Sequence, residues 1–309
     1  MFREIPFLND LFPMATDQTI ASATKGSLRL LEVQGFEDRK NDIIYGYPFN
    51  EGSNNGDVIV FFPGDVQDYI ENMEAHRDNK YHKEWNLVDT AEKLRQKFPE
   101  NHILVVKPSR MDYKTFSCFQ NFVKSSELGV PNHTSNYNSL RHLDNLLRHT
   151  IGRLQVISED KVQEASKTVP SLNNLNLIII GFSKGCVVLN QFLHEFHHFL
   201  TTEPDEIVSN LIQRIKEMYW LDGGHSGGKN TWVNDRNTLK TFCSLGIQVH
   251  VHVTPYQIHD DRRPWIKKEE KIFSDYISKN GGHITRTVHF ETVSPSILTH
   301  FEVINAFKN

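Results

Sequence analysis

The strongest constraint on the fold is an apolar, strand-like run that leads directly into a serine flanked by two glycines. Residues 175–180 are rich in leucine and isoleucine, and the next five residues read GFSKG, with Ser183 at their centre. Residues 186–200 then repeat apolar side chains at helical spacing. A buried strand, a glycine-flanked serine and an amphipathic helix, in this order, are typical of a nucleophile elbow, which presents the serine above a sheet.

The residue types around Ser183 suit nucleophilic chemistry. Gly181 and Gly185 have no side chains, so the strand and the helix can approach each other closely. The start of the following helix offers free backbone N–H groups and the positive end of the helix dipole, which stabilise a developing anion. We therefore take Ser183 as the candidate nucleophile and the N–H of Lys184 as one donor of an oxyanion hole.

Strand-like and helical patterns alternate along most of the chain. Strands are predicted at residues 27–35, 42–48, 57–62, 102–106, 175–180, 218–221, 247–254 and 283–290. Helices are predicted at residues 85–98, from about 137 to 154, and at 186–200, 237–245, 265–278 and 296–307. This alternation predicts an α/β protein with a mostly parallel central sheet and helices on both faces. With the elbow, it indicates the α/β-hydrolase fold.

The domain organisation follows from the same pattern. Residues 27–309 are expected to form one α/β-hydrolase domain. Residues 1–26 are expected to be an N-terminal segment that is either flexible or a targeting signal. This segment has Arg3 and several serines and threonines, but it also has acidic residues, which a mitochondrial presequence usually lacks. The polar stretch at 155–176 is expected to be a surface excursion.

Composition excludes several function classes. The formal net charge is −4, and no dense stripe of lysine and arginine marks a nucleic-acid partner. No apolar run approaches the roughly 20 residues that a transmembrane helix needs. The three cysteines, Cys118, Cys186 and Cys243, are odd in number and widely spaced, which argues against a disulfide framework and against zinc spacing.

The expected base is a histidine, because the α/β-hydrolase order along the chain is serine, acid, histidine. His300 is the histidine that follows the last predicted strand, at residues 283–290, and it lies in or just before the terminal helix. His300 is therefore the candidate general base.

The acid of this fold usually follows the penultimate strand. Asp260 and Asp261 follow the strand predicted at residues 247–254, and we favour Asp260. Asp222 is the alternative, because it ends the preceding strand at a glycine-rich loop. Either carboxylate would hold the imidazole in one tautomer and stabilise its protonated form.

The second oxyanion donor is expected from the loop after the strand at residues 57–62. Pro63 and Gly64 make a tight turn there, and Gly64 would lie against the serine pocket. The backbone N–H of Asp65, or that of Val66, comes next and would complete the oxyanion hole.

Two other motifs invite different interpretations. Residues 194–198 match the H-E-x-x-H zinc pattern, but helical spacing places both histidines opposite the apolar face, so we expect a solvated surface and no metal. Residues 223–230 nearly match a phosphate loop, with Asn230 where serine or threonine would bind Mg²⁺. We expect instead a glycine-rich border of the serine pocket that includes Gly224 and His225, and no cofactor.

Several segments resemble the family named for human chromosome two open reading frame sixty-nine, a group of mitochondrial α/β-hydrolase-like proteins. The matching segments start at Phe62 (FPGDVQ), Phe116 (FSC), Asn121 (NFVKS), Gly181 (GFSKGCVVLNQ), Met218 (MYWLDGGHSGG) and Val253 (VTPYQ). The resemblance implies the same fold, a serine at Ser183 and a mitochondrial location, with the cytoplasm as the alternative. It implies no substrate.

Two functions of different classes follow. The first is a serine hydrolase that acts on an ester, thioester or amide and needs no cofactor. The second is a catalytically silent hydrolase fold that acts as a binding or regulatory partner of another protein in mitochondria.

Overall fold

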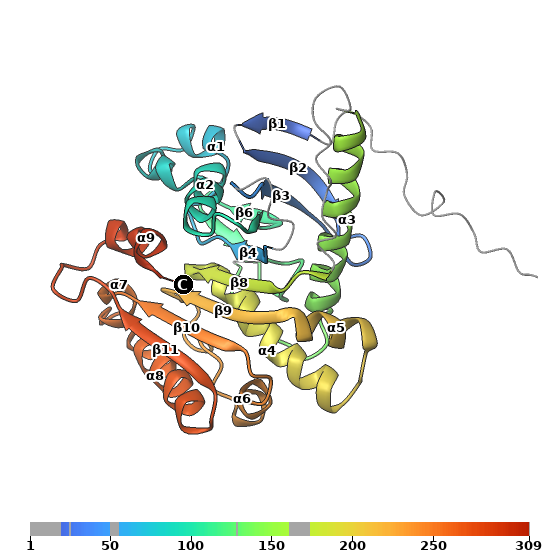
Figure 1. The fold of residues 1–309 in the computed structure, drawn as a ribbon. Helices are drawn as coiled ribbons and strands as arrows, with labels where there is room; N and C mark the ends of the chain where they lie inside the picture. The colour runs from blue at the N-terminus through green and yellow to red at the C-terminus, as the bar shows by residue number, and fades with distance from the viewer. Residues whose placement is uncertain (1–19, 25, 50–55, 128, 161–173, 309) are drawn as a thin grey trace, which may run out of the picture.

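The computed structural model describes residues 20–24, 26–49, 56–127, 129–160 and 174–308. One twisted sheet of nine strands runs through the middle of the molecule (Figure 1). The strand order is β1 (Ile20–Thr24), β2 (Ser27–Gln34), β3 (Lys40–Gly46), β5 (His102–Val106), β4 (Val58–Phe62), β8 (Leu177–Phe182), β9 (Ile215–Leu221), β10 (Gln248–Val253), β11 (His283–Val288).

The strand directions identify the fold. All neighbours from β5 to β11 are parallel, whereas β1, β2 and β3 pair antiparallel with one another and β3 pairs antiparallel with β5. The order β2-β3-β5-β4-β8-β9-β10-β11, with β3 reversed, is that of the α/β-hydrolase fold, and β1 adds one strand at the edge. The predicted fold is thus confirmed.

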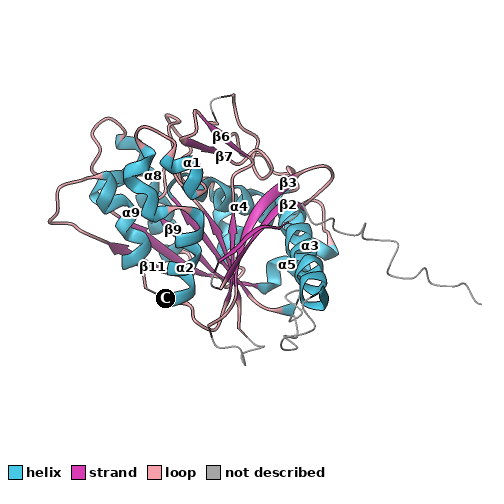
Figure 2. Ribbon diagram, turned by 90° about the horizontal axis from the view of Figure 1, so that it is seen from above, coloured by secondary structure: helices cyan, strands magenta, loops and turns pink. Residues whose placement is uncertain are grey.

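Helices cover both faces of this sheet (Figure 2). Their bounds are α1 (Ile70–Glu74), α2 (Leu87–Lys97), α3 (Ser139–Asp160), α4 (Cys186–Thr201), α5 (Glu206–Arg214), α6 (Arg236–Cys243), α7 (Pro255–Ile258), α8 (Pro264–Lys279) and α9 (Ile297–Ala306). One apolar core joins the sheet to α3, α4, α5, α6 and α8, and a second joins it to α1, α2 and α9.

The central strands β4 and β8 are apolar on both sides because each side faces one of these cores. Every residue of both strands is buried. In β4, Val58, Val60 and Phe62 belong to the first core, and Ile59 and Phe61 belong to the second. Burial on both faces is why these strands appear in the sequence as uninterrupted apolar runs.

Several segments differ from the sequence prediction, and helices α1, α5 and α7 are among those not predicted. β1 is a strand within the segment expected to be flexible or targeting, and residues 1–19 of that segment lie outside the described residues. α3 continues to Asp160, so residues 155–160, expected in a surface excursion, are helical, while 161–173 are outside the description. A short hairpin of β6 (Arg110–Asp112) and β7 (Phe116–Cys118) was not predicted.

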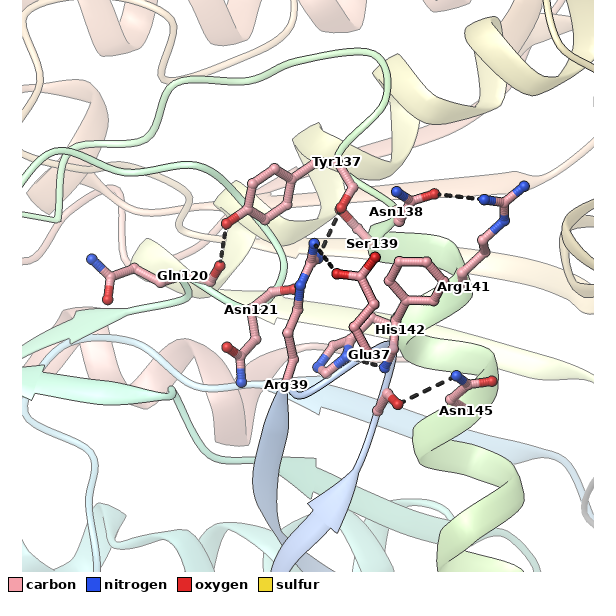
Figure 3. A network of polar contacts seen from close by, with 12 residues as sticks. Glu37, Arg39, Gln120, Asn121, Tyr137, Asn138, Ser139, Arg141, His142 and Asn145 are labelled. Carbon is pink, nitrogen blue, oxygen red and sulfur yellow. Dashed lines mark hydrogen bonds and ion pairs between the residues drawn. The ribbon is translucent and has the colours of Figure 1, made fainter. Parts of the chain in front are cut away.

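The turn between β2 and β3 is fastened to the start of α3 by polar contacts (Figure 3). Arg39 donates hydrogen bonds to the carbonyl oxygen of Tyr137 at 2.8 Å and of Asn121 at 3.2 Å. The His142 ring bridges the N–H of Phe36 and the Asn41 side chain, at 2.9 and 2.8 Å. These bonds fix the long helix α3 against the antiparallel side of the sheet.

The solvated surface predicted for residues 194–198 is wrong for Glu195, which is fully buried beneath α3. Its carboxylate accepts hydrogen bonds from the N–H groups of Ser139 and Leu140, both at 2.9 Å, and from the Ser139 hydroxyl at 2.8 Å. The first N–H groups of a helix lack partners within the helix, and a carboxylate there also suits the helix dipole. Helical periodicity could not show that α3 covers this face of α4.

Neither a metal cluster nor a transmembrane helix is found in the described part of the chain. His198 pairs with exposed Glu203 at 3.2 Å, and no group of three metal-ligating side chains gathers among the described residues. Across the same residues, none of the helices combines the length and the apolar character needed to cross a bilayer.

Glu195→Ala should destabilise the protein because it removes the carboxylate that accepts from the buried N–H groups at the start of α3. We expect the free energy of unfolding to fall by roughly 2–4 kcal/mol, since buried N–H groups lose their acceptor. Glu206→Ala, in the exposed first turn of α5, should cost less than about 1 kcal/mol. Urea denaturation of the two variants measures this, and equal losses would contradict the capping role.

Candidate active site

The serine lies at a strained turn between β8 and α4. Ser183 has a φ of +52°, a left-handed conformation that is uncommon for a residue with a side chain and is often found at functional sites. A single 3₁₀ turn, Ser183–Gly185, then leads into α4. The Lys184 N–H lies at the open start of this turn, where N–H groups have no helical partner.

Close packing explains the glycine at position 185. A Cβ atom on Gly185 would lie 2.0 Å from the backbone oxygen of Phe62, the last residue of β4. The elbow therefore presses directly against the end of the neighbouring strand. Gly64, two residues after Phe62, is also confined. A Cβ atom added there would lie 2.8 Å from the Cβ atom of Ser183.

His300 is held beside the elbow in the first part of α9. Its ring packs between the rings of Phe182 and Tyr256, with centroid distances of 4.7 and 4.6 Å. Its Nδ1 atom lies 2.6 Å from Oδ2 of Asp222. Because Asp222 accepts at Nδ1, neutral His300 has its proton on Nδ1 and a lone pair on Nε2, and this tautomer follows from the hydrogen bond.

Asp222 is the carboxylate that the structure brings to His300. It follows β9 directly, has a φ of +48°, and is fully buried. Besides His300, it accepts hydrogen bonds from the Thr254 N–H at 2.7 Å and from the Thr254 hydroxyl at 2.6 Å. Three short bonds stabilise a buried carboxylate that would otherwise be costly.

Asp260, the favoured acid of the sequence analysis, is not brought to His300. Its carboxylate pairs with Arg262 at 3.1 Å and with Arg263 at 2.8 Å, and hydrogen bonds from these guanidinium groups hold the pKa of Asp260 far below its usual range. The cause is local: Thr254 caps α7 immediately after β10, and this helix carries the following residues away. The alternative, Asp222, takes the position instead.

The side chains of Ser183 and His300 are largely enclosed by the protein. Ser183 and His300 are 8% and 5% exposed. Within the described residues, neither Ser183 Oγ nor His300 Nε2 has a hydrogen-bond partner, and neither is among the buried polar atoms sealed from solvent. Catalytic hydrogen bonds are often long before substrate binds, so this arrangement is compatible with proton transfer between them.

The loop after β4 leaves one backbone donor unused. The Gly64 N–H donates to the side chain of Gln67 at 2.9 Å, and the Val66 N–H donates to a backbone carbonyl at 2.6 Å. Between them, the N–H of Asp65 has no acceptor among the residues that the structure describes. Of the two N–H groups considered from the sequence, only that of Asp65 is available to an oxyanion.

The glycine-rich loop after Asp222 lies beside the elbow, and the His225 ring makes hydrogen bonds within this loop. The Gly224 N–H approaches the Ser183 carbonyl oxygen at 3.4 Å. His225 accepts from the Gly227 N–H at 3.0 Å and its Nε2 lies 3.2 Å from the Asn230 carbonyl oxygen. Both ring nitrogens are therefore occupied, and burial lowers the pKa of His225, so this histidine is a neutral structural residue.

The chain has clear relatives. A model of the family described as C2orf69 matches residues 29–168 and 153–282. The human "Mitochondrial protein C2orf69" is 39% identical over 286 residues, which cover 81% of this chain and 74% of the human protein. The Danio rerio homolog of the same name is 36% identical over 309 residues, covering 95% and 90%.

Solved structures with similar backbones include an esterase and another hydrolase. A thermostable esterase has a TM-score of 0.46 at 12% identity, covering 92% of this chain and 60% of the esterase. An S-formylglutathione hydrolase from Agrobacterium tumefaciens has a TM-score of 0.42 at 10% identity, covering 93% and 96%. At these scores the fold assignment rests on the strand order and not on the matches.

Gly185→Ala should disrupt the elbow because the new methyl group would collide with the backbone of Phe62. We expect a loss of at least about 3 kcal/mol in unfolding free energy, the upper end of ordinary overpacking costs. The matched control is Gly152→Ala in α3, where nothing lies within 4 Å and the change should stabilise by roughly 0.5–1 kcal/mol. Thermal and urea denaturation distinguish the two, and a neutral Gly185→Ala would contradict the close contact.

Proposed function

This chain belongs to the C2orf69 family, and we propose that it is a serine hydrolase that cleaves an ester, a thioester or an amide. The observation that carries the proposal is the 2.6 Å contact between His300 Nδ1 and Asp222 beside a serine at a strained elbow. Nucleophilic catalysis by serine requires a base next to the serine and a third group that orients the base. Ser183, His300 and Asp222 have the residue types and chain positions for these roles.

In the first half of the reaction, Ser183 Oγ attacks the substrate carbonyl carbon while His300 Nε2 takes the hydroxyl proton. The carbonyl oxygen becomes an oxyanion and accepts hydrogen bonds from the N–H groups of Lys184 and Asp65. Asp222 stabilises the imidazolium without taking its proton. The bond to the leaving group then breaks, the leaving group receives the proton from His300, and the acyl group remains on Ser183.

In the second half, water replaces the leaving group. His300 takes a proton from the water, and the resulting hydroxide attacks the acyl carbon. The bond between that carbon and Ser183 Oγ breaks, and His300 returns its proton to the serine. The released acid and the free enzyme balance the reaction, and the scheme calls on no metal or cofactor.

A catalytically silent hydrolase fold that binds or regulates another protein is the second candidate. It is favoured by the missing hydrogen bond between Ser183 and His300 in the described structure, and by the carboxylate of Asp65. A negative charge near an oxyanion raises the energy of the transition state unless it is neutralised. Because the relatives are named mitochondrial proteins, we propose the mitochondrion as the compartment for either function.

A fluorophosphonate probe, which reacts with activated serines, provides the first test. The purified wild-type protein should be labelled, Ser183→Ala should not, and His300→Ala should react at least about 100-fold more slowly, because it loses the general base. Circular dichroism confirms that each variant is folded. A folded wild-type protein that resists the probe would favour the silent binding partner.

The two candidate acids can be compared by the same labelling rate. Asp222→Asn should slow labelling on the order of 10³–10⁴-fold, because an amide in this position favours the wrong imidazole tautomer. Asp260→Asn should react at nearly the wild-type rate, because its carboxylate contacts arginines and not His300. The labelling rate of each variant is divided by its concentration of folded protein. A slow Asp260→Asn beside a normal Asp222→Asn would reverse the assignment.

A further inference from the structure

Lys184, the residue after the proposed nucleophile, places a cation in an enclosed position. Its side chain is only 3% exposed. Burial of a charged ammonium is costly unless the charge is paired and hydrogen-bonded. Lysines usually avoid this cost by extending into water along an apolar stem. The buried ammonium of Lys184 therefore needs an anionic group that accepts its hydrogen bonds.

Among the described residues, no acceptor lies within hydrogen-bonding distance of the Lys184 ammonium. The nearest carboxylate oxygen is Asp65 Oδ1, 3.9 Å from Lys184 Nζ, which is beyond hydrogen-bonding distance. No hydrogen bond links Nζ to any part of the chain that the structure describes. An ammonium has three donors and no acceptor, so all three are left unmatched. Nζ is also absent from the sealed buried atoms, so it borders solvent.

Asp65 is engaged elsewhere. Its Oδ1 atom accepts hydrogen bonds from both the N–H of Ser117, at 2.7 Å, and the Ser117 hydroxyl, at 2.9 Å. These bonds tie the loop after β4 to strand β7. Burial of the carboxylate raises the pKa of Asp65 although Lys184 and the Ser117 bonds act in the opposite direction. Asp65 Oδ1 is thus already engaged by Ser117 and approaches the ammonium of Lys184 only to 3.9 Å.

Gly129 lies against the ammonium, and the described residues around it offer no second acid. A Cβ atom on Gly129, whose φ is +70°, would lie 3.0 Å from Lys184 Nζ and 2.6 Å from the sulfur of Cys118. His225, on the glycine-rich loop, uses both ring nitrogens within its own loop. Apart from Asp65, no acidic side chain of the described chain forms an ion pair with Lys184.

We propose that the Lys184 ammonium binds a carboxylate of the substrate, so that this hydrolase takes esters or thioesters with a negatively charged group a few bonds from the scissile carbonyl. The inference rests on the proposed hydrolase function. Lys184 Nζ lies 3.9 Å from the carboxylate of Asp65, the residue whose backbone N–H is one proposed oxyanion donor, so the ammonium borders the proposed oxyanion site. A substrate carboxylate supplies charge-assisted hydrogen bonds that Asp65 does not make.

Two matched fluorophosphonates test the inference without a known substrate. They have alkyl chains of equal length, one ending in a methyl group and the other in a carboxylate. The measured quantity is the ratio of the second-order labelling rate constants, carboxylate probe over methyl probe. Because both probes react at the same serine, the ratio cancels changes in serine reactivity.

Wild-type protein should prefer the carboxylate probe, and Lys184→Met should lower the ratio by about 10- to 100-fold, as expected for loss of a hydrogen bond to a charged group. Lys184→Arg keeps the charge and should retain most of the preference. Lys229→Met, an exposed lysine on the glycine-rich loop, should leave the ratio at the wild-type value.

The possible failures are distinct. If neither probe labels folded wild-type protein, the proposed hydrolase function fails and this inference fails with it. If both probes label Ser183 and wild-type protein does not favour the carboxylate, the hydrolase stands and the substrate inference is overturned. An unchanged ratio in folded Lys184→Met overturns it in the same way.

Discussion

The buried carboxylate of Asp222 is the interaction on which the rest of the site depends. It follows β9, binds the first turn after β10 through Thr254, and holds His300 of α9. Three segments that are distant in the sequence therefore share one charged group inside the protein. Removal of any single donor would leave part of a buried charge unpaired, which is expensive in a medium of low polarity. The same bonds that position the imidazole thus also join the C-terminal helix to the edge of the sheet where the strands end.

The other half of the site is built by close backbone contact. Gly185 packs against the last carbonyl of β4, and Gly64 packs against Ser183 itself. Because β4 and β8 are parallel neighbours in the sheet, their C-terminal ends lie side by side. The loop that follows β4 consequently carries the free N–H of Asp65 alongside the elbow, where the N–H of Lys184 also lies. The parallel sheet brings both donors to one edge, which is where α/β proteins place their ligands.

Sequence patterns predicted those features that depend on a single helix, strand or turn. The uninterrupted apolar runs of β4 and β8 and the glycines of the elbow are local signals, and they located the sheet and Ser183. The partner of His300 depends on which strand ends meet, and Asp222 and Asp260 look alike without that knowledge. The positive φ of Asp222 and the cap at Thr254 decide between them, and neither is visible in composition. Glu195 was misjudged for a related reason, because a helical pattern describes one helix and not the helix α3 that covers it.

Lys184 and Asp65 connect the chemistry of the backbone with that of the side chains. Each offers a backbone N–H near the elbow, and their side chains bring an ammonium and a carboxylate to 3.9 Å between Nζ and Oδ1. A fully formed ion pair between them would leave the site nearly neutral and would stabilise the resting protein. The bonds from Ser117 engage the same Asp65 oxygen that approaches the ammonium, so among the described residues the ammonium keeps donors without acceptors. In the proposed hydrolase reaction, this positive charge would also favour the oxyanion, because electrostatic stabilisation is greatest where water is excluded. One lysine can therefore serve both the developing charge of the transition state and a permanent charge on the substrate.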